Sequence, residues 1–343
     1  MTYFTPKSVS DGDISLPDAD PRVDGISIII PTYNGAAWIL SSLQSVLSQD
    51  SMIPLEVVVV DDCSTDQTFE VVLAVNDARV SCHSTGKNSG VAAARNIGIK
   101  LAKYDWVAFN DQDDIWCPGR LVKQLAVLAK LADAIGVAGG AARMAADGSS
   151  IWTGRFFGFQ WTPVLSLKLS HPPYYNPLTD GASYLQTLIV SRDVTLRSGG
   201  FNEGLPLADD LDFAMRIGRL GRFGWVPEPM FLYRLGYHNQ TAPSVAKAKT
   251  FIAAQAFVHA ANAARKAGSA ELDVVDFMRN YEPSSKQYAE FKIRQSIRYI
   301  NTIWVYEGLL QAAWVGMKIF AGSPWLFLQQ LYERVRYWTL LGR

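Results

Sequence analysis

The sequence has no excess of charge of either sign and few cysteines. Lysine plus arginine number 32, as do aspartate plus glutamate, so there is no basic field to attract nucleic acid and we expect no nucleic-acid partner. The cysteines Cys63, Cys82 and Cys117 are odd in number and lack CxxC spacing, which argues against a disulfide framework and a thiolate zinc site. These absences favour a reducing, cytoplasmic location.

The first 25 residues lack an apolar core segment. They carry acids and prolines, so we expect residues 1–25 to be a flexible leader and neither a signal peptide nor a membrane span. The chain as a whole has 343 residues and is 49% hydrophobic, which is enough for a folded protein with a substantial core.

From residue 26 onward, short apolar runs alternate with stretches of helical periodicity. ISIIIPTYN, LEVVVVDDCSTD and WVAFNDQDD are apolar runs that end in polar residues, as expected of strands buried on both faces. Helical patterns at 36–49 and in VAAARNIGIKLA lie between them. The alternation predicts an α/β fold with a doubly wound, mostly parallel sheet.

Beyond about residue 240 the chain is at first rich in alanine and free of proline, and it keeps a helical look, which predicts a helical C-terminal appendage over 241–343.

The ends of the three predicted strands carry the polar residues of interest. Each set could simply cap the helix that follows, but ligands of such sheets bind at the carboxyl ends of the strands, so three polar ends favour one shared site. Asp111 and Asp113 stand two residues apart and offer oxygen ligands suited to Mg²⁺ or Mn²⁺, and hence to a diphosphate. A solvated turn is the alternative for so short a motif.

Four segments together resemble a known family. ISIIIPTYN, VVVVDDCSTD, NSGVAAARNIG and NDQDDIWCPGRL, in this order and spacing, closely resemble the family 2 glycosyltransferases with the GT-A fold. SRDVTLRSGGFNEGLPLADDLDFAMRIGRLG is similar to the second signature of that family. The resemblance implies a GT-A catalytic domain over 26–240, with a nucleotide-sugar half at about 26–118 and an acceptor half at about 119–240.

The resemblance also implies roles for single residues. The donor nucleotide and its diphosphate would be bound by Asp62, Pro31, Thr32, Tyr33, Arg95 and Asp111, with His238 as a further contact unless it is a plain loop histidine. Asp113, together with Asp111, would hold the metal.

The general base would be Asp210, the second residue of the pair Asp209-Asp210. The family usually has Glu in the first position, so it stays open which of the two is the base. Arg216 either acts in the site or pairs with Asp212, four residues earlier on the same helix.

The function implied is an inverting sugar transfer that depends on Mn²⁺ or Mg²⁺. The donor would be a UDP-, GDP- or dTDP-sugar and the acceptor a hydroxyl of a glycan or lipid-linked glycan in surface polysaccharide synthesis. DQDDIW resembles the form found in rhamnosyl-type transferases, so a hexosyl- or rhamnosyltransferase is expected. A sugar nucleotidyltransferase and an inactive sugar-nucleotide-binding scaffold are the alternatives. PTYNGAAW lacks GxGxxG, which argues against a dinucleotide-dependent oxidoreductase.

The C-terminal segment differs in charge from the rest of the chain. Residues 286–343 hold eight basic and three acidic residues together with four tryptophans. This composition predicts either peripheral docking on the inner face of the cell membrane or packing against the catalytic domain or a second copy of the chain. Glu307 and Lys318 interrupt the apolar stretch at 302–322, which argues against a membrane span.

Overall fold

The computed structural model describes residues 20, 22–50, 53–144, 184–234 and 247–292, short strands between 151 and 175, and the single residues 317, 320, 321 and 324. Most of the predicted leader, the segment with His238 and nearly all of the C-terminal segment therefore lie outside the described residues. The predictions made for them stay predictions.

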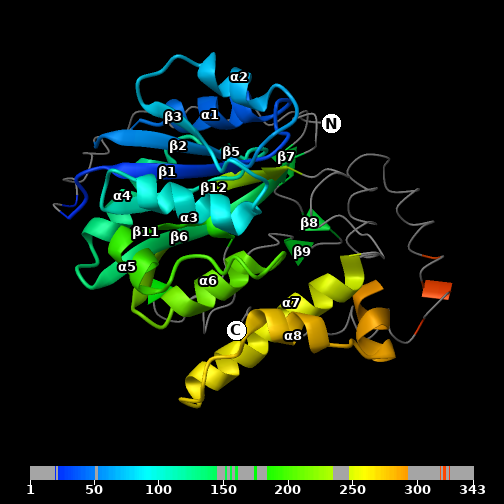
Figure 1. The fold of residues 1–343 in the computed structure, drawn as a ribbon. Coiled ribbons are helices and arrows are strands. Elements are labelled where there is room, and N and C mark those ends of the chain that lie inside the picture. Colours follow the sequence, from blue (N-terminus) through cyan, green and yellow to red (C-terminus); the bar gives the residue numbers. More distant parts are fainter. Residues whose placement is uncertain are drawn as a thin grey trace.

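A twisted sheet forms the centre of the molecule, with helices packed on both of its faces (Figure 1). Its described strands follow the order β10-β12-β6-β11-β4-β1-β2-β3, with β5 beside β12 and β7 beside β6, while β8 and β9 pair separately. The strands are β1 Ile26–Thr32, β2 Leu55–Asp61, β3 Val80–Ser84, β4 Trp106–Phe109, β5 Ile115–Trp116, β6 Ala134–Met144, β7 Ile151–Trp152, β8 Arg155–Phe156, β9 Phe159–Gln160, β10 Tyr174–Tyr175, β11 Ile189–Ser191 and β12 Arg222–Arg234.

The helices connect these strands. They are α1 Ile39–Leu47, α2 Thr68–Leu73, α3 Val91–Leu101, α4 Arg120–Ala129, α5 Arg192–Arg197, α6 Asp209–Ile217, α7 Ala248–Lys266 and α8 Val274–Asn280, with a 3₁₀ turn, η1, at Leu185–Thr187. The strands and helices predicted between residues 26 and 110 all form, with shifts of a few residues at their ends.

The first half of the sheet is parallel and buried on both faces. β1 pairs in parallel with β2 and β4, and every residue of β1 is buried. Along β2, Val58 and Val60 pack with Ala94 of α3, whereas Val57 and Val59 belong to the main core that includes Leu43 of α1. Because successive strand residues point to opposite faces, a continuous run of valines serves both layers.

The second half of the sheet is mixed in direction. β11 runs antiparallel to both β4 and β6, while β6 and β12 pair in parallel along most of their length. The glycines of β6 permit this pairing across the irregular part of β12: a Cβ on Gly139 would lie 2.3 Å from Cγ of Met230. The predicted α/β fold with a doubly wound, mostly parallel sheet is confirmed, with β11 as an antiparallel insertion.

The C-terminal helices α7 and α8 share an apolar core with α6. Phe257 and Val258 of α7 form a second core with Leu205, and Leu211 and Met215 of α6 pack against it. The helical character predicted after residue 240 is found in α7 and α8. Within the described residues this helical region is joined to α6 through a shared core.

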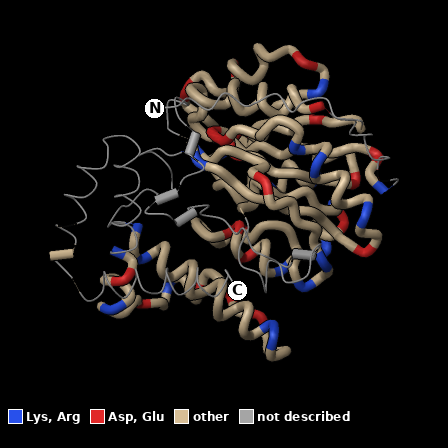
Figure 2. Tube along the Cα trace, turned by 180° about the vertical axis from the view of Figure 1, so that it is seen from behind, with Lys and Arg blue, Asp and Glu red and all other residues tan. Residues whose placement is uncertain are grey.

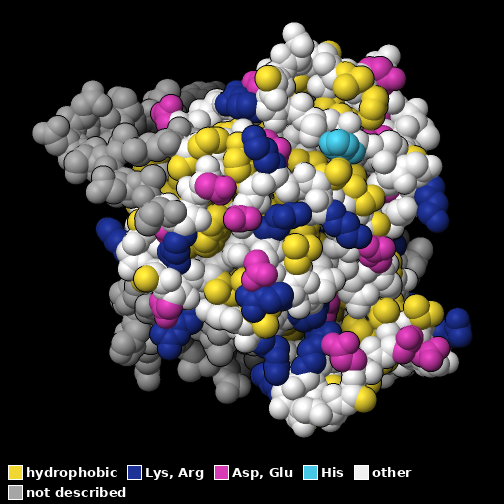
Figure 3. All heavy atoms as spheres, turned by 60° about the vertical axis from the view of Figure 1, so that its left-hand side comes forward, with side chains coloured by type: hydrophobic (Ala, Val, Ile, Leu, Met, Phe, Trp, Pro, Cys, Tyr) yellow, Lys and Arg dark blue, Asp and Glu magenta, His cyan; other side chains and the backbone are white. Residues whose placement is uncertain are grey.

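Basic and acidic residues are interspersed over the described surface. Figure 2 shows lysines and arginines alternating with aspartates and glutamates along the trace. On the face shown in Figure 3, hydrophobic side chains lie scattered between charged ones of both signs. No helix among the described residues combines the length and apolar character needed to cross a membrane.

Candidate active site

The loops after β1 and β4 meet where the strand order reverses. β1 lies between β2 and β4, so its carboxyl end is the switch point at which doubly wound sheets bind ligands. Oε1 of Gln112 accepts hydrogen bonds from the Thr32 hydroxyl at 2.6 Å and from the Tyr33 backbone N–H at 2.9 Å. Thr32 is buried and Tyr33 is 42% exposed. Gln112 thus joins the two loops and leaves Tyr33 accessible to a ligand.

The loop after β2 is tied to the β1 loop and to the start of α3. Oδ1 of Asn34 accepts a hydrogen bond from the Thr65 backbone N–H at 2.8 Å. Asp62 is buried, and its two carboxylate oxygens accept from the backbone N–H groups of Ser89 at 2.7 Å and Gly90 at 2.8 Å. These bonds give Asp62 a role in fixing the N-terminus of α3, while its contact with the nucleotide base stays a prediction.

Arg95 joins two acids that are distant in sequence. Its Nη1 donates to Oδ2 of Asp209 at 2.6 Å and its Nη2 donates to Oδ1 of Asp111 at 2.9 Å. The guanidinium is buried and lies 5.3 Å from the centroid of the Phe201 ring. Burial alone would lower the pKa of Arg95, but the charges of Asp209 and Asp111 raise it above its ordinary value. Arg95 is therefore a fixed cation that links the β4 loop to α6.

Asp111 is held from a second side by Gln186. Nε2 of Gln186, in η1, donates to Oδ2 of Asp111, while the neighbouring Thr187 carbonyl accepts from Gln124 of α4 at 2.7 Å. Gln186 is buried, whereas the Asp111 side chain is 31% exposed. Arg95 and Gln186 together fix the direction of the Asp111 carboxylate without closing it off from solvent.

The other two acids of the DQDD segment differ in their surroundings. Asp114 is buried, and its Oδ1 accepts from the Arg234 backbone N–H at 3.0 Å. Burial and then the charges of Asp113 and Asp111 raise the pKa of Asp114 well above its usual range. Loss of solvation and then the charge of Asp111 raise the pKa of the half-buried Asp113 to about 6. Asp111 and Asp113 thus place negative charge at the edge of the site, which a cation would stabilise.

The acids fit a divalent cation whose remaining ligands come from elsewhere. Among the described residues, no three His, Cys, Asp or Glu side chains are grouped closely enough to hold a metal. Two carboxylates with water and phosphate oxygens are a donor set that Mg²⁺ and Mn²⁺ accept. The oxygens of Asp111 already accept hydrogen bonds from Arg95 and Gln186, so Asp113 is the more available ligand.

The acidic pair at the start of α6 divides into a buried and an exposed residue. Asp209 is 5% exposed and faces Arg95, whereas Asp210 is exposed to solvent. Loss of solvation beside the surrounding protein and then the negative charge of Asp209 raise the pKa of Asp210 to about 6, whereas the positive charge of Arg95 acts to lower it. Ala208, just before the pair, has φ 62°, a left-handed conformation uncommon outside glycine. An accessible carboxyl with a pKa near neutrality is suited to accept a proton.

The structure brings most of the predicted residues to one edge of the sheet. Pro31 lies inside β1, paired with Val60, and is buried, so within this loop Tyr33 is better placed to meet a ligand. Nε of Arg216 donates to Oδ2 of Asp212 at 2.8 Å, which confirms the ion-pair interpretation of Arg216. His238 lies outside the described residues.

The sequence patterns predicted no role for two residues of the site, Gln112 and Gln186. Gln112 stands between the predicted acids, and its position there was a signal that could have been used. Gln186 had no such signal, because a single amide far from the other motifs belongs to no recognisable pattern.

The fold is similar to that of solved GT-A glycosyltransferases. S. aureus TarS in complex with UDP-GlcNAc has a TM-score of 0.53 and 20% identity, over 82% of this chain and 73% of that chain. GalNAc-T7 with UDP, GalNAc and Mn²⁺ has a TM-score of 0.55 and 15% identity, over 79% of this chain and 57% of that chain. At such identities the likeness concerns the fold, and the predicted GT-A fold is confirmed.

Residues 27–181 match the family model described as Glycosyl transferase family 2, so this part of the chain is a family 2 glycosyltransferase domain. The succinoglycan biosynthesis protein ExoO of Rhizobium meliloti is 38% identical over 109 residues, 32% of this chain and 31% of that protein. UDP-Glc:alpha-D-GlcNAc-diphosphoundecaprenol beta-1,3-glucosyltransferase WfaP of Escherichia coli is 36% identical over 100 residues, 29% of this chain and 39% of that protein. This chain spans between about a third and a half of the length of such curated relatives.

Proposed function

We propose that the protein transfers a sugar from a nucleoside diphosphate sugar to a hydroxyl group of a growing polysaccharide, with inversion at the anomeric carbon. The observation that carries the proposal is the link made by Arg95 between Asp111 on the donor side and Asp209, which lies directly beside the exposed Asp210. One buried cation thus links Asp111, the proposed leaving-group side, to the acid beside Asp210, the proposed proton acceptor, and a transfer reaction needs these two groups close together.

On the donor side, the exposed Tyr33 would meet the base of the nucleotide, in keeping with the position of its loop at the switch point. Arg95 would lie near the diphosphate. Asp113 and Asp111 would hold Mn²⁺ or Mg²⁺, which when bound neutralises charge on the leaving diphosphate. GalNAc-T7, a neighbour in fold, was solved with UDP and Mn²⁺, which supports this metal and this nucleotide class.

On the acceptor side, Asp210 would take the proton of the attacking hydroxyl. The acceptor oxygen forms the new bond to the anomeric carbon while the bond from that carbon to the diphosphate oxygen breaks. One base on the face opposite the leaving group gives inversion, and no enzyme nucleophile is needed. The exposure of Asp210 and its pKa of about 6 support this role, and Asp209 would serve to hold Arg95.

A UDP-sugar is the donor class we favour, since TarS was solved with UDP-GlcNAc and WfaP is named for UDP-Glc. We propose a lipid-linked glycan as the acceptor, because WfaP is named for a diphosphoundecaprenol acceptor. Such an acceptor would bring the enzyme to the inner face of the membrane. Whether the sugar is rhamnose or a hexose stays a prediction.

A thermal unfolding screen tests the donor side of the proposal. UDP-, GDP- and dTDP-sugars are added to the wild-type chain with and without Mn²⁺, since a ligand at about 100 times its Kd stabilises by about 2.7 kcal/mol. Asp113→Ala should lose the stabilisation that depends on metal. Asp105→Ala is the matched control, because Asp105 is exposed and directly precedes β4, the strand whose other end leads to Asp113.

The thermal screen, combined with assays of sugar transfer, donor hydrolysis and pyrophosphate release, separates the proposed transferase from the alternative functions. A UDP-sugar that stabilises the protein and is transferred to a glycan acceptor supports the proposal. Stabilisation without transfer or hydrolysis would favour a binding scaffold, and release of pyrophosphate from a nucleoside triphosphate and a sugar phosphate would favour a nucleotidyltransferase. If no nucleotide sugar stabilises the wild type, the proposed donor site is wrong.

A further inference from the structure

The helix that carries the acidic pair is packed between two cores. Phe213 and Ile217 of α6 belong to the main core beside the sheet. Leu211 and Met215 of the same helix pack against the second core, which includes Phe257 of α7. The position of α6 therefore depends on the C-terminal helices as well as on the sheet.

One face of α6 carries charged residues in place of apolar ones. Asp209, Asp212 and Arg216 are spaced i, i+3 and i+7, so they lie along one stripe of the helix. Asp209 is anchored by Arg95. The Asp212 side chain is 0% exposed and accepts hydrogen bonds from Nε of Arg216 at 2.8 Å and Nη1 of Arg265 at 3.2 Å.

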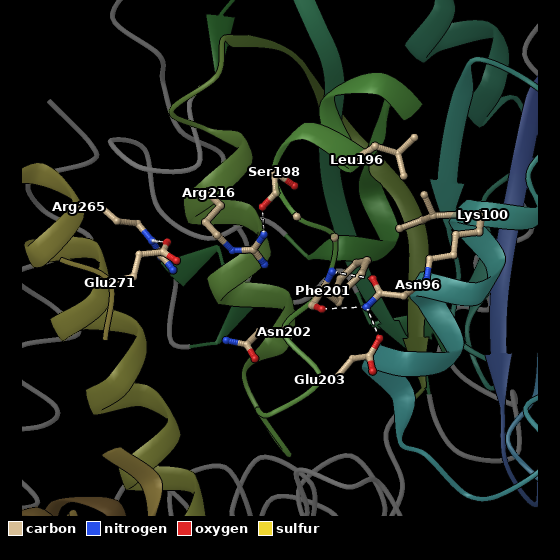
Figure 4. A pocket seen from close by; sticks show the side chains of 13 residues that line it. Asn96, Lys100, Leu196, Ser198, Phe201, Asn202, Glu203, Arg216, Arg265 and Glu271 are labelled. Atoms are coloured by element: carbon tan, nitrogen blue, oxygen red, sulfur yellow. Dashed lines mark hydrogen bonds and ion pairs between the residues drawn. The ribbon is translucent and has the colours of Figure 1, made fainter. Parts of the chain in front are cut away.

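Arg265 comes from the last turn of α7 and is itself held in place. Its carbonyl accepts from Nη2 of Arg219 at 3.2 Å, and its Nε donates to Oε1 of Glu271 at 3.3 Å. Arg216 also donates to the Ser198 carbonyl, and the two guanidiniums bind different carboxylate oxygens of Asp212, Oδ2 for Arg216 and Oδ1 for Arg265. Figure 4 shows both arginines on the wall of a pocket of about 570 Å³, Arg265 from α7 and Arg216 from α6.

Two ion-pair anchors on one stripe restrict how α6 can move. The bond to Arg95 holds its first turn, and the bond to Arg265 holds a point three residues further on. A helix held at two points of one face cannot rotate about its axis or slide along it without separating Asp209 from Arg95 or Asp212 from Arg265, and each separation takes a cationic partner from a buried carboxylate, which is unfavourable. Asp210 stands next to the first anchor, so its direction follows from the rotation of the helix.

We propose that Arg265 is a positioning residue for the proton acceptor: its bond to Asp212 fixes the rotation of α6 and thereby the direction of Asp210. The inference rests on the proposed function, since it assigns a purpose to α7 in that same reaction. Arg265 lies outside residues 27–181, the segment that matches the family model. The C-terminal helices of this chain would therefore be part of the catalytic machinery in a way that the family motifs do not indicate.

The test compares three variants of full-length protein in steady-state transfer with the donor found in the thermal screen. Arg265→Met keeps the length of the side chain and removes its charge, and Arg265→Lys restores a cation. Lys266→Met is the matched control, because the neighbouring Lys266 is exposed and has the same charge. We expect Arg265→Met to lower kcat about tenfold or more with the donor KM and Kd unchanged, since about 1 Å of misplacement can cost about a hundredfold.

Arg265→Lys should recover part of the lost kcat, and Lys266→Met should behave as the wild type. Assays are run well below the unfolding temperature of each variant. If Arg265→Met lowers the unfolding temperature but keeps the wild-type kcat there, the residue is merely structural and the inference is wrong. An increase in the donor Kd of Arg265→Met would also overturn the inference, because the substitution would then act on donor binding and not on the direction of Asp210. Failure of the proposed function is recognised separately, by wild-type protein that transfers no sugar or by Asp210→Asn that transfers it normally.

Discussion

The proposed donor side and the proposed acceptor side of the site are held together in different ways. On the donor side, the loops after β1, β2, β3 and β4 bind one another through polar side chains and backbone groups, as Gln112, Asn34 and Asp62 do. On the acceptor side, α6 is held by arginines from two distant segments, Arg95 and Arg265. The first arrangement is built from neighbouring strand ends, and the second from side chains that the tertiary fold alone brings together.

The difference matters for how each side responds to change. The loss of one neutral hydrogen bond between loops, such as the bond from Thr65 to Asn34, costs about 0.5–1.5 kcal/mol. The loss of one partner in a buried ion pair leaves a charge without compensation and costs about 3–5 kcal/mol. The acceptor side is therefore the more vulnerable of the two, and substitutions there should have the larger effects.

The largest effect is expected within the acidic pair. Asp210→Asn should leave donor binding by calorimetry intact and lower the rate of transfer by about 10²–10⁴-fold, as the removal of a general base does. Asp209→Asn should lower the rate less and stability more, because Asp209 holds Arg95. Asp193→Asn, an exposed acid in the first turn of α5, is the control. An active Asp210→Asn with an inactive Asp209→Asn would reverse the assignment within the pair.

The next effect concerns stability. Arg95→Met should lower the free energy of unfolding in urea by about 3–5 kcal/mol, since it leaves the buried Asp209 carboxylate unpaired. Arg197→Met breaks the exposed pair with Asp193, whose two side chains are 59% and 69% exposed, and should cost about 0–1 kcal/mol. Equal losses in the two variants would contradict the view that Arg95 holds the acceptor side together.

The smallest effect is expected from pH. A base must be unprotonated to act, so kcat at saturating donor should fall about tenfold per pH unit as the pH drops below about 6, the raised pKa of Asp210. Above that value kcat should level off. A rate that stays flat down to pH 4 would mean that Asp210 keeps an ordinary pKa or does not take the proton.

Much of the fold could be predicted because its signals are local. A run such as Ile26–Thr32 shows its buried strand in its own composition, and the polar residues that follow it mark a strand end. The parallel order of such strands then places Tyr33 and Asp111 at one edge. The family resemblance added the roles that are proposed for the individual acids.

The remainder depended on contacts between distant segments. Gln186 meets Asp111, and Arg265 meets Asp212, without any periodicity or motif that links the members of each pair. The antiparallel β11 was not foreseen either, because Ile189–Ser191 is three residues long and leaves too little pattern to show its direction. Likewise, Asp209 is buried and Asp210 is exposed because of how α6 packs, and two adjacent aspartates in a sequence give no sign of this difference.

The place of β11 between β4 and β6 has a consequence for the chain during synthesis. β1, β2, β3 and β4 are complete once residue 109 has emerged, but the neighbour that covers the open edge of β4 begins only at Ile189. At about 5–20 residues per second, the ribosome needs several seconds to supply it. During that interval β4 is an unpaired apolar edge strand, open to wrong partners. The yield of folded protein in a cell should therefore depend on how quickly that stretch is translated and on whether a chaperone shields the edge until it arrives.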